Sequence, residues 1–204
     1  MLRAVKAGVW CVALAPLAWL LLLAVENRLG PDPGKALVDG LGLWALRLLL
    51  ITLLLRPLRE ISGRSVFLQV RRLVGLFAYF YATLHLAGSV FYVIGFSVPE
   101  LLHALRERTY IVLGFAAWLL MVPLTLTSNR WAQRRLGRRW AALHRLIYPL
   151  AILACLHFVW LVRSDYWQPL LYSALLAFLL LWRVPVLQRA RRDWLESRRL
   201  RSEN

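Results

Sequence analysis

The chain has few acidic residues, two cysteines and four histidines, and each of these low counts limits the class of protein to which it can belong. Its 10 Asp and Glu stand against 26 Lys and Arg, which gives a formal net charge of +16. The cysteines, Cys11 and Cys155, fall in apolar segments, where a thiol usually packs as a small apolar group. Because these segments are expected to be different helices, with the two thiols at opposite depths, we expect no disulfide.

Long loops and glycine-rich phosphate loops are also missing. Gly40-Leu41-Gly42 is the nearest approach to such a loop, but it lacks a third glycine and lies inside an apolar run. The connections between apolar runs have about 20 residues or fewer, and about as many follow Arg183. We therefore expect no flavin or nicotinamide domain, and any electron donor must be a separate molecule.

Apolar residues, by contrast, are abundant. They make up 60% of the chain, and the mean hydropathy is +0.59. Several apolar runs approach the ~20 residues that a helix needs to cross hydrocarbon. The sequence therefore predicts an all-α polytopic membrane bundle, a single domain over residues 1–204, with six transmembrane helices. These are residues 8–25, 38–55, 73–96, 109–126, 143–162 and 168–187. The first is expected to be a retained helix, because Glu26-Asn27-Arg28 follows it instead of a small-residue cleavage site.

The positive charge is distributed unevenly between the two ends of the six helices. Outside the expected spans, 20 Lys and Arg fall at the end that holds both termini, and 5 fall at the other. Since Lys and Arg gather on the cytoplasmic side, both termini are expected in the cytoplasm. The basic side chains are then expected to contact anionic lipid heads, and no nucleic-acid partner is needed to explain them.

Two histidines, His85 and His157, lie deep within expected spans. At ~1.5 Å per residue they lie roughly 18 Å and 21 Å from the cytoplasmic ends of their helices, so the imidazoles are nearly level. An ionisable side chain at that depth usually marks a cofactor, a relay or a pathway. Two neutral imidazoles facing each other can be the axial ligands of haem iron, with both residues as metal ligands. A proton relay, or core histidines bonded to neighbouring carbonyls, are the alternatives.

His144 lies at the cytoplasmic mouth of the fifth span, about 20 Å along the helix from His157. It is either a histidine at the level of the lipid headgroups or a contact for a second redox group. No other histidine is expected at that depth, because His103 falls in the outer loop 97–108. A second bis-histidine haem is therefore weakly supported.

Arg47 is the one Lys or Arg deep inside an expected span, away from the span ends. It is estimated to lie near the depth of His85, where a buried guanidinium needs an anionic partner. A haem propionate would supply one through bidentate hydrogen bonds. Asp39, two turns away and nearer the surface, is the alternative partner.

A set of ordered motifs covers the whole chain. It runs from Trp44-Ala45-Leu46-Arg47 through the histidine-bearing segments, and its remaining members are Arg71-Arg72-Leu73-Val74-Gly75-Leu76 before Tyr79, Tyr81 and His85; Thr127-Ser128-Asn129; Arg135-Leu136-Gly137; Trp140; and Leu143-His144-Arg145-Leu146 with Tyr148 and His157. This set resembles the haem-binding membrane subunit of the bacterial periplasmic protein-methionine-sulfoxide reductase system, in the ferric-reductase-like transmembrane group.

The resemblance implies a b-type cytochrome of the bacterial inner membrane that binds haem b. Such a protein takes electrons from the quinone pool or a cytoplasmic flavin reductase. It passes them to a periplasmic molybdopterin-containing methionine sulfoxide reductase subunit, with which it forms a heterodimer. Family members are also described as flavin-binding, with FMN as the expected species. By position, His85 and His157 match the haem ligands and His144 a third family histidine, while Arg71 and Arg72 are candidates for a flavin phosphate or quinone site.

Two functions of other classes stay open from the residues alone. One is a proton channel or transporter that uses the three intramembrane histidines as a relay, and the other is a membrane anchor for a partner. A transporter would be favoured by broken helices and internal repeats. Pro149 is the one sign of a broken helix, and the two halves show no obvious repeat.

Overall fold

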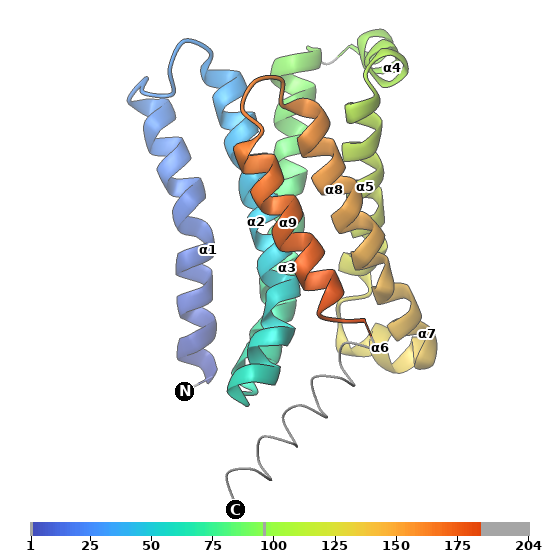
Figure 1. Ribbon diagram of the computed structural model, residues 1–204. Coiled ribbons are helices and arrows are strands. Elements are labelled where there is room, and N and C mark those ends of the chain that lie inside the picture. The colour runs from blue at the N-terminus through green and yellow to red at the C-terminus, as the bar shows by residue number, and fades with distance from the viewer. Residues whose placement is uncertain (1, 96, 185–204) are drawn as a thin grey trace, which may run out of the picture.

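The computed structural model describes residues 2–95 and 97–184, and every regular element within them is a helix. Six long helices form the bundle in Figure 1. They are α1 (Leu2–Val25), α2 (Pro33–Ser62), α3 (Val66–Gly88), α5 (Thr109–Leu126), α8 (Ile147–Leu161) and α9 (Trp167–Leu181). The expected all-α fold is confirmed for these residues.

Five helical segments are long and apolar enough to cross a membrane: Leu2–Val25, Pro33–Ser62, Val66–Tyr92, Thr109–Leu126 and Arg138–Leu161. Each contains or overlaps one of the first five expected spans, and the fourth has the expected bounds. The sixth, Trp167–Leu181, is apolar but has 15 residues, which is about 22 Å of helix. The expected end of that span, residues 185–187, lies outside the described residues.

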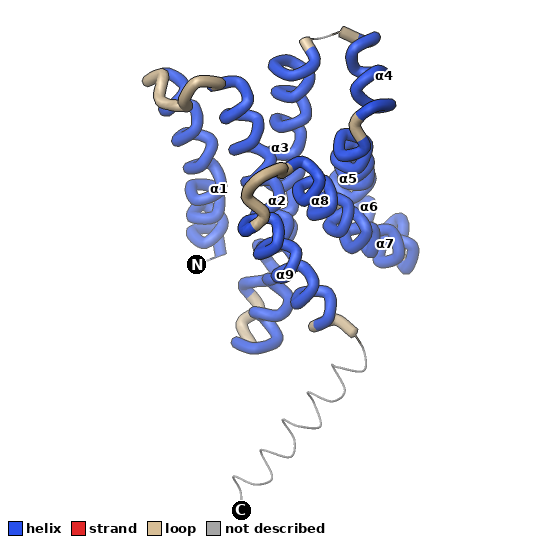
Figure 2. The backbone as a smooth tube through the Cα atoms, turned by 45° about the horizontal axis from the view of Figure 1, so that its top comes forward, coloured by secondary structure: helices blue, strands red, loops and turns tan. Residues whose placement is uncertain are grey.

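Polar stretches that looked like loops contain short helices. The expected outer loop 97–108 forms α4 (Val98–Glu107), which the Ser97 side chain caps by accepting from the backbone N–H of Glu100. Figure 2 shows α4 at the end of α5. The expected cytoplasmic region 127–145 forms α6 (Arg130–Leu136), capped by Asn129, then α7 (Arg138–Leu143) and one 3₁₀ turn, η2 (His144–Leu146). With 7 and 6 residues, α6 and α7 are too short to show an apolar period, whereas α4 repeats Val98, Leu101, Leu102 and Leu105 at helical spacing after its Ser97 cap and could have been predicted.

The two ends of the bundle differ in composition. The start of α1, the α2–α3 turn and the short helices α6 and α7 lie at one end in Figure 1, and we name it the basic end because it collects most of the arginines. The α1–α2 connection, α4 and the α8–α9 connection lie at the opposite end. The α3 helix ends there in a π-helical segment, η1 (Ser89–Ile94), which stops at Gly95 with a positive φ of 72°.

The core is centred on α2 and its neighbours. Leu50, Leu53 and Leu150 are at most 2% exposed, and Ala78 and Ala151 are fully buried. The peripheral helix α1 is joined to this core by Tyr81, a fully buried residue of α3. Its hydroxyl donates to the Ala13 carbonyl at 2.7 Å and accepts from the Leu17 N–H at 3.0 Å. One side chain thus satisfies two backbone groups beside the helix-breaking Pro16.

Candidate functional site

The structure brings His85 of α3 and His157 of α8 together inside the bundle. Their ring centroids are 6.1 Å apart, the ring planes make an angle of 76°, and both residues are half-buried. They are separated by 72 positions in the sequence, so only the packing of the two helices makes them neighbours.

Each imidazole is held by a backbone carbonyl of an adjacent helix. The Nδ1 atom of His85 lies 2.9 Å from the Val38 carbonyl oxygen of α2, and that of His157 lies 2.6 Å from the Tyr110 carbonyl oxygen of α5. Because a carbonyl oxygen only accepts, Nδ1 must carry the proton and donate it in both rings. The Nε2 atom of each neutral ring then keeps its lone pair for a metal.

The separation of the two rings suits one iron between them. Two metal–nitrogen bonds of about 2.0 Å, with about 1.1 Å from each nitrogen to its ring centre, require roughly 6.2 Å between centroids. The observed 6.1 Å agrees with this requirement. Within the described residues, no group of three His, Cys, Asp or Glu side chains could hold a bare metal ion. A macrocycle that supplies four nitrogens itself needs only this pair.

His144, in the 3₁₀ turn before α8, has a different environment. Its ring stacks on Trp140 with centroids 4.0 Å apart, and its Nε2 lies 3.0 Å from the Thr127 hydroxyl. That hydroxyl donates to the Pro123 carbonyl at 2.6 Å, so its oxygen accepts and the His144 proton is on Nε2. The tautomer is therefore the opposite of that in the other two rings. His103, the fourth histidine, is exposed on α4 at the opposite end, so it cannot pair with His144.

Arg47 is half-buried on α2. Its Nε donates to the Tyr172 hydroxyl of α9 at 2.8 Å, and its guanidinium lies 4.8 Å from the centre of the Trp44 ring. The alternative partner considered above, Asp39, is instead paired with Lys35, one turn before it on the exposed side of α2. Tyr172 was not predicted as a partner, because an isolated tyrosine in an apolar helix carries no positional signal.

Arg71 and Arg72 lie near the start of α3, at the basic end. Arg71 is half-buried, with Tyr148 and Arg56 as electrostatic neighbours, whereas Arg72 is exposed. The two neighbouring arginines therefore do not share one environment, and only Arg71 is half-buried, near Tyr148 of α8, the helix that carries His157.

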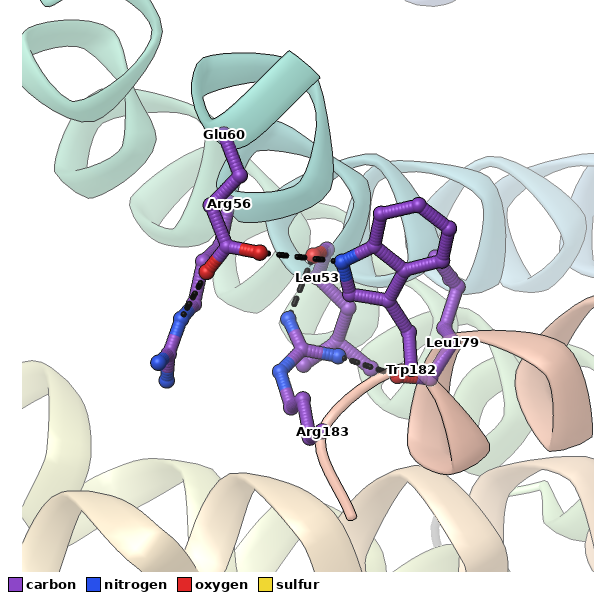
Figure 3. Close-up of polar contacts among 6 residues, drawn as sticks. All are labelled: Leu53, Arg56, Glu60, Leu179, Trp182 and Arg183. Atoms are coloured by element: carbon purple, nitrogen blue, oxygen red, sulfur yellow. Dashed lines mark hydrogen bonds and ion pairs between the residues drawn. The ribbon is translucent and has the colours of Figure 1, made fainter. Parts of the chain in front are cut away.

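A polar cluster that sequence reasoning missed joins α2 to the end of α9, as Figure 3 shows. Glu60 accepts from Arg56 at 3.1 Å and from the Trp182 indole at 3.0 Å. Arg183 donates to the carbonyls of Leu53 and Leu179. The contacts of Trp182 with Glu60 and of Arg183 with Leu53 link residues more than 100 positions apart, and no local pattern in the sequence could have indicated these two.

At the opposite end, a surface pocket lies directly beyond His157. It is lined by Glu107, Arg108, Thr109, Tyr110, Trp160 and Arg163. Tyr110 belongs to both places, because its carbonyl accepts from His157 and its ring centroid is 6.1 Å from that imidazole. Tyr110 therefore links the histidine pair directly to the surface pocket at this end.

Comparison with known proteins identifies a matching family model and several similar sequences. The family model described as "Ferric reductase like transmembrane component" matches residues 41–155. That stretch contains His85 and His144 and ends two residues before His157.

Full-length relatives carry the name protein-methionine-sulfoxide reductase heme-binding subunit MsrQ. The chain is 46% identical to the one from Xanthomonas axonopodis pv. citri over 187 residues, which cover 89% of this chain and 86% of the relative. It is 40% identical to the one from Bordetella pertussis over 189 residues, covering 92% of each. No solved structure shows significant similarity.

Proposed function

Because this chain belongs to the ferric-reductase-like transmembrane family, together with haem-binding subunits of protein-methionine-sulfoxide reductase, we propose that it is a membrane b-type cytochrome. It carries electrons from the quinone pool or a cytoplasmic flavin donor across the bacterial inner membrane. The recipient is a periplasmic molybdopterin subunit, which reduces methionine sulfoxide in oxidised proteins.

One observation carries this proposal: two half-buried imidazoles with centroids 6.1 Å apart, each donating its Nδ1 proton to a backbone carbonyl. A carbonyl acceptor on the far nitrogen fixes the tautomer and raises the basicity of the ligating nitrogen. Haem, when bound, supplies a one-electron carrier inside the hydrocarbon layer. His85 and His157 would hold it through their Nε2 atoms.

The surrounding residues suit distinct tasks along the bundle. Arg47, which Tyr172 orients through Nε, has its remaining guanidinium N–H groups available for a haem propionate. At the basic end, His144 and the half-buried Arg71 lie near each other, where a quinone or the phosphate of FMN would meet a histidine and a cation. At the opposite end, Tyr110 connects the His157 imidazole with the surface pocket, where an electron would leave.

The orientation follows from the charge distribution. From the sequence, 20 basic residues are expected at one end against 5 at the other, so the basic end would face the cytoplasm, and α9 would act as the sixth and shortest span. A short apolar helix can be accommodated by local thinning of the bilayer. The whole chain would then be one haem-binding domain with the Tyr110 pocket on the periplasmic side.

The test is the absorption spectrum of the purified protein after expression with ample haem. We expect a red protein with a reversible b-type reduced-minus-oxidised spectrum. His85→Ala and His157→Ala should each lose most of the haem, because an axial pair needs both imidazoles. His103→Ala is the matched control, since His103 is exposed on α4.

A colourless wild-type protein, or normal haem content in correctly inserted His85→Ala, would refute the assignment. A colourless protein that conducts protons would instead support the histidine relay.

A further inference from the structure

Two glycines lie against the two intramembrane imidazoles. A Cβ atom built on Gly42 of α2 would lie 2.7 Å from Nδ1 and 2.9 Å from Cε1 of His85. A Cβ atom on Gly114 of α5 would lie 2.8 Å from the same two atoms of His157. Real Cβ contacts are almost never closer than 3.0 Å, so neither ring could keep its place beside an alanine.

Each glycine stands one helical turn after the carbonyl that holds the same ring. Val38 precedes Gly42 by four residues, and Tyr110 precedes Gly114 by four. On a helix these positions are adjacent on one face. The imidazole therefore lies over the bare backbone at the glycine, where its Nδ1 reaches the carbonyl of the preceding turn.

The same arrangement of carbonyl, glycine and histidine occurs twice in the chain. The histidine lies 47 residues after its carbonyl partner in both cases, and the two sets are displaced by 72 positions in the sequence. The histidines also end similar tetrads, Ala82-Thr83-Leu84-His85 and Ala154-Cys155-Leu156-His157. The two halves thus share a local repeat that is not obvious from the sequence: the pair α2 and α3 and the pair α5 and α8 hold their histidines in the same way.

Other helical glycines lack this relation to a histidine. Gly75 of α3 would place its Cβ at an ordinary 3.5 Å from Thr52, and Gly8 faces open space. Gly40, two residues before Gly42, would place its Cβ 2.9 Å from the terminal methyl of Leu20, a flexible group that can turn away. Gly40 is therefore the matched control for Gly42: the helix is the same and the approach is similar, but the neighbour is not a histidine.

We propose that Gly42 and Gly114 are positioning residues, which seat His85 and His157 against the helix backbone so that each ring donates to its carbonyl and presents Nε2 to the iron. The part that concerns iron rests on the proposed haem function. An alanine at either position forces the ring back by about 0.7 Å, from 2.7 Å to the 3.4 Å of ordinary contact, and this weakens the carbonyl bond.

The first test needs no haem chemistry. Thermal unfolding in detergent is measured for Gly42→Ala and Gly40→Ala, each in the wild type and in His85→Ala. Alanine is a better helix former than glycine, so Gly40→Ala should raise Tm or leave it unchanged in both backgrounds. Gly42→Ala should lower Tm in the wild type but not in His85→Ala, where no ring opposes the methyl group.

An equal effect of Gly42→Ala in both backgrounds would overturn the proposal. If Gly42→Ala fails to insert, recovery of insertion in the Gly42→Ala, His85→Ala double variant supports the proposal, and failure of the double variant overturns it.

The second test measures how strongly the imidazoles donate to the iron. In haem-loaded Gly42→Ala and Gly114→Ala, loss of the carbonyl bond makes the imidazole a weaker donor. We expect the reduction potential to become more positive and the low-spin ferric EPR signal to fall, with Gly40→Ala and Gly75→Ala like the wild type. Wild-type values in both glycine variants would overturn the proposal. A wild-type protein without haem would refute the proposed function alone, because the unfolding test would still report on the glycines.

Discussion

Replacing Arg47 by glutamine tests whether this arginine binds an anionic cofactor group. The guanidinium now has one hydrogen bond, to Tyr172, and a cation–π contact with Trp44 at 4.8 Å. Glutamine can still donate to the Tyr172 hydroxyl but carries no charge. A hydrogen bond to a charged partner contributes about 1.5–3 kcal/mol. Since 1.4 kcal/mol is tenfold in an equilibrium constant, the variant should bind haem about 10–100-fold more weakly.

Tyr172→Phe is the companion variant, because it removes the orienting hydroxyl and leaves the charge. Hydrogen bonds between membrane helices average about 0.6 kcal/mol, so the expected loss of haem affinity is about threefold. Arg47→Lys should fall between Arg47→Gln and the wild type, because lysine keeps the charge but lacks the bidentate fork. The assay is transfer of haem to an excess of a soluble haem scavenger. Equal affinity for Arg47→Gln and the wild type would refute the propionate contact.

Three further predictions follow from the same contacts. His144→Ala should keep the haem held by the other two histidines and its reduction by dithionite, while reduction by quinol or flavin slows; an unchanged rate would make His144 a bystander. Tyr81→Phe should destabilise the protein by about 1–2 kcal/mol in equilibrium unfolding, since one hydroxyl serves two backbone groups of α1; an unaltered stability would contradict that role. A reporter fused after Asn204 should work only if it is active in the cytoplasm, and strong activity of a periplasm-only reporter would overturn the orientation.

The sequence predicted the helices better than the contacts between them. All six long helices lie where apolar runs were found, because a run of that length has few other stable forms in a membrane. His85 and His157 were identified because ionisable groups at that depth are rare. The short helix α6 was missed because its seven residues are too few for a helical period, and α4 was missed although its apolar residues recur at helical spacing.

The repeat was missed for a different reason. Its conserved chemical element on α2 and α5 is a backbone carbonyl, which valine supplies at position 38 and tyrosine at position 110. Valine and tyrosine share no side-chain feature, so the trace of the repeat in the sequence is confined to the equal spacing from Gly42 to His85 and from Gly114 to His157 and to the similar tetrads. The partner of Arg47 was equally hidden, because Tyr172 comes 125 residues later in the chain.

The placement of His85 and His157 on two different helix pairs, α2 with α3 and α5 with α8, has a consequence for how the protein would mature. Neither pair holds both imidazoles, so a group that binds both would also fasten one half of the bundle to the other. Binding to the assembled state alone adds about 2.7 kcal/mol when the free ligand is at 100 times its Kd. Haem supply would then set the fraction of newly inserted chains that are fully assembled, and a haem-starved cell would accumulate a looser bundle open to proteolysis.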